Sequence, residues 1–261
     1  MDVRLDGRKA LITGGSQGLG LAVGKRFADS GGDVVIFARR EDLLAEARAE
    51  IEAVADGGKV AAFSCDVSDA TAIAETYAKV QAEFGEIDIL VNNAGSSVHA
   101  AFEDATDEIW QTDLDLKLFA AIRLSRLAIR GMKQRRWGRI INTLNIGAKT
   151  PSASGAPTQV SRAAGLALTK VIAGDGAPHN VLCNALLVGK IATDQVKRRH
   201  QRNAPDTPLE DFIAEEAKPV PLGRMGTAEE YANIACFLAS DHGSYITGTA
   251  LNVDGNLSPV V

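Results

Sequence analysis

Short apolar runs recur along the chain, separated by longer segments in which apolar residues repeat at helical spacing. Runs of this length, rich in Val, Ile and Leu, predict buried β-strands. The first run is Ala10-Leu11-Ile12, directly before a polar turn. In all, the pattern predicts seven strands, at residues 10–12, 34–37, 59–64, 87–91, 138–144, 181–187 and 249–253.

The segments between these strands place apolar residues three or four positions apart, as on one face of an α-helix. After the second strand, Leu43, Ala47 and Ile51 fall on one such face. Thr227 followed by Glu230 has the spacing of a capping box, which marks the start of a helix. Helices are therefore predicted at residues 21–28, 43–54, 73–84, 106–134, 157–173 and 227–238.

Strands and helices that alternate at this rhythm predict a parallel sheet with helices on both faces. The sequence contains no linker, internal repeat or low-complexity tract. A hydrophobic content of 46% over 261 residues suits one large core better than two small ones. We therefore expect an α/β protein with one domain over residues 1–261, a Rossmann fold with a doubly wound, seven-stranded parallel sheet.

Composition and charge exclude several classes of function. The formal net charge is −5, so the overall balance gives no support for a nucleic-acid or anionic-membrane partner. The sequence shows no leader and no apolar run of membrane-spanning length, so we expect a cytoplasmic protein. Cys65, Cys183 and Cys236 are scattered and odd in number, which favours reduced core thiols. Without a C-x-x-C or H-E-x-x-H motif, no metal site is expected.

The strongest chemical signal directly follows the first strand. Thr13 is followed by glycines at positions 14, 15, 18 and 20, and then by an amphipathic helix. A strand, a glycine-rich turn and a helix together place backbone N–H groups and a helix N-terminus against a pyrophosphate. The spacing is Gly-x3-Gly-x-Gly, and no Lys-Ser/Thr pair follows, so the segment is not a P-loop. Alone, such a turn is equally compatible with a structural role.

Three further loops follow predicted strands and should lie beside this turn. They are residues 38–40, 65–67 and 92–95. In an open parallel sheet, ligands bind outside the carboxyl ends of the strands, where all four loops would meet. Their convergence predicts a dinucleotide site more firmly than the glycines alone.

Several motifs in this order resemble those of the short-chain dehydrogenase/reductase family, closest in layout to beta-ketoacyl-carrier-protein reductases. The resemblance covers nearly the whole chain. It rests on the TGGSQGLG segment at 13–20, Asp66-Val67, the NNAG segment at 92–95, Trp110, GRI at 138–140, Asn184, LGRMG at 222–226, YITG at 245–248 and VDG at 253–255.

The resemblance implies a carbonyl or alcohol oxidoreductase that binds a nicotinamide dinucleotide. It also implies a homotetramer built through the helices at 106–134 and 157–173, and a substrate lid at about 194–220. The cofactor positions that it implies are Gly14, Ser16, Gln17, Gly18, Leu19, Gly20, Arg39, Arg40, Asp66, Val67, Asn93, Ala94, Gly95, Arg162 and Thr193.

The residues after the second strand indicate which dinucleotide is bound. An acidic residue there would accept a hydrogen bond from a free ribose 2′-OH, whereas an arginine would pair with a 2′-phosphate. The family's acidic position falls on Ala38, and Arg39 and Arg40 follow it. A guanidinium suits phosphate, so NADP(H) is favoured over NAD(H). The alternative is that both arginines belong to a solvated loop.

All four catalytic positions of the family carry other residues here. Counted without gaps from neighbouring motifs, its Asn, Ser, Tyr and Lys fall on Lys117, Asn145, Thr158 and Arg162. An aliphatic hydroxyl such as that of Thr158 cannot replace a phenol as a proton donor near neutrality. Arg162 could still bind ribose hydroxyls, and Asn145 could still orient a carbonyl oxygen.

Lys117 is the new titratable group among these positions. Partial burial and the charge of Arg162 would lower its pKa, so that it could serve as an acid or base. The alternative is a surface lysine, or one paired with Asp113 or Asp115. Ser152, Ser154 and Ser161 offer hydroxyls without an obvious base, and His99 is expected to face solvent.

The lid region carries a basic cluster at residues 197–202, which could meet an anionic substrate or form an exposed helix. Three functions remain open for the whole chain. One is an NADP(H)-dependent oxidoreductase with a rearranged proton donor, acting on a small molecule. The others are a redox-silent isomerase or lyase with Lys117 as base, and an inactive nucleotide-binding sensor or partner subunit.

Overall fold

A computed structural model describes residues 2–261, and its centre is a seven-stranded sheet in which every pairing is parallel. The strand order is β11-β8-β6-β4-β1-β2-β3. All seven predicted strands fall within two residues of the observed ones at both ends, and the fold class is confirmed. The strands are β1 (Lys9–Thr13), β2 (Asp33–Ala38), β3 (Val60–Ser64), β4 (Ile89–Asn92), β6 (Gly138–Asn145), β8 (Val181–Val188) and β11 (Ala250–Val253).

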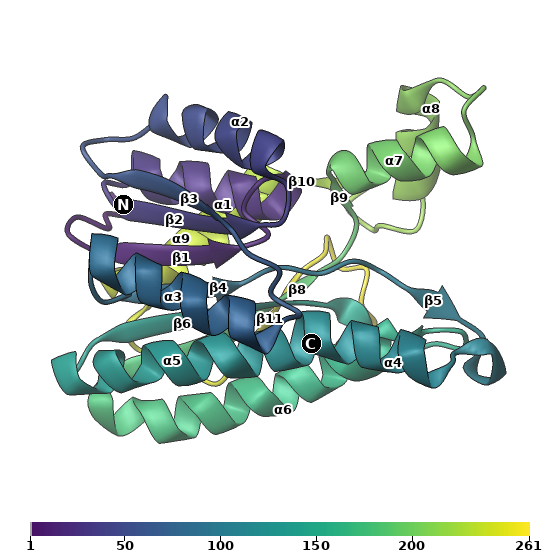
Figure 1. The fold of residues 1–261 in the computed structure, drawn as a ribbon. Helices are drawn as coiled ribbons and strands as arrows, with labels where there is room; N and C mark the ends of the chain where they lie inside the picture. Colours follow the sequence, from purple (N-terminus) through teal and green to yellow (C-terminus); the bar gives the residue numbers. More distant parts are fainter. Residues whose placement is uncertain (1) are drawn as a thin grey trace.

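Helices cover both faces of this sheet (Figure 1). One face carries α1 (Gly18–Asp29), α2 (Glu41–Glu52) and α9 (Ala228–Ala239). The opposite face carries α3 (Ala70–Phe84), α5 (Ala120–Arg135) and α6 (Thr158–Gly176). The predicted capping box is present at the start of α9, where Thr227 and Glu230 bond each other's backbone amides.

The helical region predicted at 106–134 is interrupted. It consists of α4 (Asp107–Leu114), a π-helical turn η2 (Asp115–Phe119) and α5. A π turn widens the helix by one residue and changes which side chains face inward. Lys117 lies in this turn and is buried. Sequence periodicity could not reveal the π turn, because helical spacing of apolar residues continues on both sides of it.

Several short elements surround the carboxyl edge of the sheet. β5 (His99–Ala100) pairs antiparallel with β7 (Ala156–Pro157), and β9 (Ile191–Ala192) pairs with β10 (Gly226–Thr227). Two-residue strands have no periodicity, so the sequence did not predict them. The helix expected to begin at Pro157 begins one residue later. Four 3-10 turns complete the structure: η1 (Phe102–Asp104), η3 (Ile146–Ala148), η4 (Ala177–His179) and η5 (Asp241–Gly243).

The polar region before residue 221 contains two helices, α7 (Asp194–Asn203) and α8 (Leu209–Ala217). They project from the sheet beside β9 and β10 (Figure 1). Their small apolar cluster includes Val196, Ala217 and Met225 and is separate from the two main cores. None of the helices within residues 2–261 has the length and apolar character needed to cross a membrane.

The sheet positions a ligand crevice through its strand order. β1 is followed by β2 and β3 on one side, and the chain then crosses to β4 on the other side of β1. At such a reversal the loops leave the sheet in opposite directions, which opens a crevice at the carboxyl ends of the strands. The glycine-rich turn after β1 and the Asn92–Gly95 segment after β4 meet there.

Candidate active site

The glycine-rich turn has a backbone that side chains would obstruct. Gly14 and Gly18 have φ angles of 65° and 54°, in the left-handed region that favours glycine. A Cβ added to Gly20 would lie 2.2 Å from the carbonyl oxygen of Gly14. The start of α1 can therefore approach the end of β1 only with glycine at this position.

Thr13 connects the turn to the loop after β4. Its Oγ1 accepts hydrogen bonds from the backbone amides of Asn93 and Ala94, each at 2.9 Å. The side-chain amide of Asn93 donates in return to the carbonyl oxygen of Thr13 at 2.9 Å. These bonds fix two of the predicted cofactor loops against each other without any ligand.

The second-strand loop lies beside the same turn. Arg39 and Arg40 are both exposed, and Arg40 donates from Nη2 to the side-chain oxygen of Gln17 at 3.0 Å. Asp66 accepts hydrogen bonds from the amide and hydroxyl of Ser68. Burial opposes ionisation of Asp66, but these hydrogen bonds and the charge of Arg39 outweigh it, so the pKa of Asp66 is lowered.

A buried polar cluster contains two of the four catalytic positions predicted from the resemblance, Lys117 and Thr158, together with Asp113 and Ser161. Lys117 donates from Nζ to Asp113 and, at 2.8 Å, to Oγ1 of Thr158. Ser161 donates from Oγ to the other carboxylate oxygen of Asp113 at 2.6 Å. The side chains of Lys117 and Asp113 are only 2% and 1% exposed. The carboxylate therefore organises an ammonium and two hydroxyls at one point.

The environment of Lys117 lowers its pKa to about 8. Burial is the largest cause, since it penalises the charged ammonium. The hydrogen bond to Asp113 raises the pKa, and the positive charge of Arg162 lowers it further. Lys117 therefore stays mostly protonated at pH 7 and is half-protonated near pH 8, well below the pH at which an unperturbed lysine loses its proton.

Arg162 lies on the other side of the crevice floor. Its Nη1 donates to the carbonyl oxygen of Thr143, and burial lowers the pKa of its guanidinium. A Cβ added to Gly95 would lie 2.5 Å from Nη2 of Arg162, so the guanidinium lies directly over the backbone of the Asn92–Gly95 segment.

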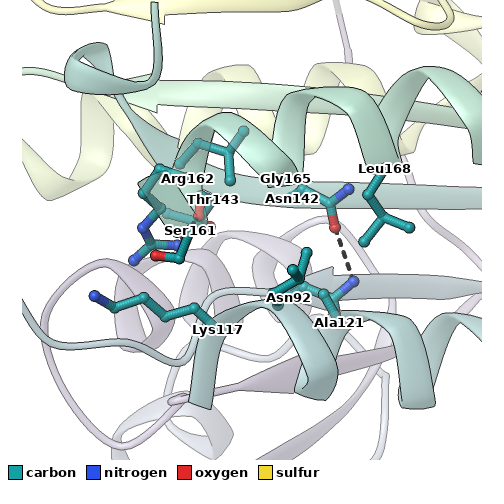
Figure 2. A pocket seen from close by; sticks show the side chains of 11 residues that line it. Asn92, Lys117, Ala121, Asn142, Thr143, Ser161, Arg162, Gly165 and Leu168 are labelled. Atoms are coloured by element: carbon teal, nitrogen blue, oxygen red, sulfur yellow. Dashed lines mark hydrogen bonds between the residues drawn. The ribbon is translucent and has the colours of Figure 1, made fainter. Parts of the chain in front are cut away.

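A small cavity lies between these side chains (Figure 2). Its volume is about 10 Å³, enough for about one water molecule and not for a substrate. Lys117, Ser161 and Arg162 line one end, and the hydrogen-bonded side chains of Asn92 and Asn142 line the other. A larger cavity of about 230 Å³ lies on the far side of Asp113, lined by Ser96, Val98, Glu108, Ile109, Thr112 and Leu116.

The known proteins to which this chain is similar include reductases and dehydrogenases. Residues 14–258 match the family model described as enoyl-(acyl carrier protein) reductase. The chain is 35% identical over 259 residues to a 3-oxoacyl-[acyl-carrier-protein] reductase FabG of Chlamydia pneumoniae, covering 99% of this chain and 100% of the relative. It belongs to the short-chain dehydrogenase/reductase family.

Other members of this family are similar over the same length. A 3alpha-hydroxysteroid dehydrogenase of Mediterraneibacter gnavus is 33% identical and covers 98% of each chain. The crystal structure of L-sorbose reductase from Gluconobacter frateurii, complexed with NADPH and L-sorbose, has a TM-score of 0.93 at 32% identity and covers 100% of each chain. By family, the protein is therefore an oxidoreductase.

The sequence anticipated part of this site. Lys117 and Arg162 lie within electrostatic range of each other, as expected. The pairing of Lys117 with Asp113, which was the alternative interpretation, is also present, so the two interpretations are not exclusive. His99 is exposed, as expected. Asn145 ends β6, and its buried Oδ1 makes no hydrogen bond within residues 2–261.

Two residues of the cluster take parts that the sequence did not predict. Ser161 has no obvious base in the sequence, whereas in the structure its hydroxyl donates a hydrogen bond to Asp113. The sequence offers Asp113 as a partner of Lys117, but it does not predict that the pair is buried or that it also binds α6. The signal was its position four residues before Lys117, which is the spacing of a helical ion pair. That spacing does not reveal burial, which depends on α6 packing across both residues.

Metal ions are usually held by clusters of His, Cys, Asp and Glu side chains. Within residues 2–261, His, Cys, Asp and Glu side chains form no group of three or more that could hold one. The three cysteines are free and buried.

Proposed function

We propose that this protein is an NADP(H)-dependent oxidoreductase that acts on a small carbonyl or alcohol substrate with a non-standard active site. The observation that carries the choice of cofactor is the pair of exposed arginines after β2. Neither Arg39 nor Arg40 forms an ion pair with a carboxylate within residues 2–261, and Arg40 uses only one N–H on Gln17, so both guanidiniums retain donors for a 2′-phosphate. The complex of the related L-sorbose reductase with NADPH supports the same assignment.

The dinucleotide, when bound, supplies or accepts a hydride. We infer that the turn residues Gly14, Ser16, Gln17, Gly18, Leu19 and Gly20 bind the pyrophosphate, chiefly through backbone N–H groups. Asp66 and Val67 would contact the adenine, and Asn93, Ala94 and Gly95 would line the nicotinamide side. Thr193 would contact the carboxamide. The left-handed glycines and the Thr13 hydrogen bonds support this assignment, because they prearrange the backbone of the turn.

Arg162 would bind the ribose hydroxyls beside the nicotinamide. Its guanidinium is already held by the carbonyl oxygen of Thr143 and lies over Gly95, so little conformational entropy remains to be lost on binding. An arginine cannot transfer its own proton near neutrality. The role that we assign to Arg162 is therefore binding and electrostatic.

The proton for carbonyl reduction would come from Lys117. The Thr158 hydroxyl, which donates to Asp113 at 3.3 Å in this structure, would turn to the substrate oxygen and pass it a proton only as the Lys117 ammonium gives a proton to Oγ1 of Thr158 along their 2.8 Å hydrogen bond. Lys117 is then the acid, and Thr158 only conducts the proton. An N–H bond breaks at Lys117 while the O–H bond re-forms at Thr158. Asp113 positions both groups, and Asn145 would orient the substrate oxygen. A donor with a pKa of about 8 is suited to this task near neutral pH.

We expect this relay to be slower than direct transfer from a phenol. The ammonium and hydroxyl are buried, and general acid–base catalysis contributes about 10²- to 10⁴-fold to rates. Part of this rate enhancement depends on direct contact between the proton donor and the substrate, and a relay through Thr158 lacks that contact. The named relatives are reductases and dehydrogenases, which favours slow redox chemistry over a redox-silent isomerase or an inactive sensor.

Two structural features bear on the substrate. Residues 194–220, with α7 and α8, would act as its lid. Lys197 and Arg199 of the basic cluster pair with Asp194 and Glu216, which leaves less charge for an anionic substrate than the sequence suggested. A neutral or singly charged carbonyl compound fits this lid better than a polyanion.

The decisive experiment measures binding and turnover separately. Calorimetry should detect NADPH binding to the wild-type protein and a loss of about tenfold or more in affinity in Arg39→Ala. A panel of carbonyl substrates should then show slow NADPH consumption. Replacing Lys117, Asn145, Thr158 and Arg162 together by Asn, Ser, Tyr and Lys should raise the rate. Absence of binding to either nicotinamide nucleotide would refute the proposal.

A further inference from the structure

The side chain of Gln17 connects two arginines from distant parts of the chain. Its Oε1 accepts a hydrogen bond from Nη2 of Arg40 at 3.0 Å and another from Nη1 of Arg198 at 3.2 Å. Gln17 is the residue that precedes α1, at the end of the glycine-rich turn. Arg40 follows β2, and Arg198 lies on α7, 181 residues away from Gln17 in the sequence.

Arg198 differs from its neighbours on α7 in having no acidic partner. Lys197 pairs with Asp194 at 3.4 Å, and Arg199 pairs with Glu216 at 2.7 Å. Within residues 2–261, neither Arg198 nor Arg40 has a carboxylate within ion-pair distance. Two guanidiniums therefore converge on one neutral oxygen, and their mutual repulsion is not offset by any acidic side chain.

The base of α7 is fixed beside the turn, which makes this convergence a property of the fold. Thr193 precedes α7, and its Cβ lies 3.6 Å from where a Cβ on Gly18 would be. One turn into the helix, Val196 is buried against the apolar cluster of α8 and Met225. With both ends of this first turn held, the exposed side chain of Arg198 extends towards Gln17.

The chemistry of the two arginines matches a phosphate dianion. Each guanidinium uses one N–H on Gln17 and retains further donors in a planar fork that suits phosphate oxygens. Arg40 lies where the ribose 2′ position is recognised in this type of fold, whereas the pyrophosphate is met by the backbone of the turn. The ligand group within reach of both Arg40 and Arg198 would therefore be the 2′-phosphate, which is the group that distinguishes NADPH from NADH.

We infer that Arg198 binds the 2′-phosphate of NADPH together with Arg40, so that α7 closes on the phosphorylated cofactor. This inference rests on the proposed NADP(H) function. In NADH-bound protein the two arginines would lack their anion, and α7 would be held less firmly. The lid would thus discriminate between the cofactors before any substrate enters.

The test compares three single variants with the wild type by calorimetry with NADPH and with NADH. Arg198→Ala should weaken NADPH binding roughly tenfold and leave NADH binding unchanged. Arg40→Ala should do the same. Arg202→Ala, which removes another exposed arginine from α7, should change neither affinity.

Hydrogen exchange over residues 194–203 provides a second measurement on the same proteins. NADPH should slow exchange of α7 amides in the wild type more than NADH does, and this difference should disappear in Arg198→Ala.

The affinities also define what would overturn the inference. If Arg198→Ala weakened the binding of NADPH and of NADH equally, or changed neither, the inference would be wrong. If Arg40→Ala lost the preference for NADPH while Arg198→Ala kept it, the role assigned to Arg198 would be wrong, but the proposed NADP(H) function would stand. If the wild type bound neither nucleotide, the proposed function would fall with it.

Discussion

At the scale of single residues, Lys117 and Asp113 form an ion pair whose side chains are only 2% and 1% exposed. Burying two charges costs free energy that their attraction and hydrogen bonds must offset. Here the carboxylate accepts hydrogen bonds from Lys117 and Ser161, so both of its oxygens are used. Removing one partner would leave an uncompensated charge in the interior, and such changes typically cost about 3–5 kcal/mol of stability.

The lowered pKa of Lys117 leads to a prediction about the pH dependence of the reaction. Carbonyl reduction needs the protonated ammonium, so kcat should be highest below pH 8 and should fall as the pH rises through about 8. Alcohol oxidation needs the neutral amine and should rise through the same pH. Initial rates in both directions, measured between pH 6 and 10, would check this.

Two variants serve as controls for the pH profile. Lys117→Gln keeps a polar group at the site but has no proton to lose, so the change in rate near pH 8 should vanish. Lys149→Gln removes a lysine that hydrogen-bonds Ala250 and Asn252 away from the cluster, and it should keep the wild-type profile. A profile that survives Lys117→Gln unchanged would assign the proton to another group.

At the scale of elements, the packing of α1 against the end of β1 depends on one glycine. Alanine is the better helix former, so Gly20→Ala would be expected to stabilise an ordinary helix. In this protein its Cβ would lie 2.2 Å from the Gly14 carbonyl oxygen, so the turn must shift. We expect Gly20→Ala to reduce the melting temperature by several degrees and to abolish measurable nucleotide binding.

Gly174 of α6 provides the matched comparison. A Cβ there meets nothing within 4 Å, so Gly174→Ala should raise stability by about 0.5–1 kcal/mol and leave nucleotide affinity unchanged. Thermal unfolding and calorimetry on both variants would measure the contrast. If Gly20→Ala and Gly174→Ala had the same melting temperature and nucleotide affinity, the close approach of α1 to the end of β1 would be contradicted.

At the scale of the whole molecule, α5 and α6 present apolar side chains to solvent. Val160 and Val171 on α6 are 52% and 61% exposed, and Leu127 lies on the neighbouring α5. Residues 160 and 171 are about three helical turns apart and so share one face. Large apolar side chains that are exposed on one helix face favour a protein interface. We propose that it joins subunits of the homotetramer that the family resemblance implies.

A charge on this face should separate the subunits. Val171→Asp should convert a tetramer to a dimer in light scattering coupled to size exclusion, with an unchanged far-ultraviolet circular dichroism spectrum. Val54→Asp alters an exposed valine after α2, on the opposite side of the sheet, and should leave the assembly intact. A tetramer that persists in Val171→Asp would place the interface elsewhere.

The main elements of the fold were predictable from the sequence because their signals are local. Apolar runs, helical spacing and the Thr227–Glu230 cap each operate within a few residues. The short pairs β5–β7 and β9–β10 and the π turn at Asp115–Phe119 were not predictable. They are stabilised by contacts with distant segments, and no local pattern marks them.

By itself, the sequence determined the order of the strands and helices, the glycine-rich turn and the arginines after β2. It also predicts that other residues stand at the four catalytic positions implied by the family resemblance. Tertiary structure alone decided that Thr158 and Ser161 of α6 meet the Lys117–Asp113 pair, since these contacts join residues 41 to 48 positions apart. It also decided that Arg198 meets Gln17. The physical reason is that the burial and the pKa of a side chain depend on the segments that pack against it. These segments can be distant in the sequence, so the neighbouring residues do not predict them.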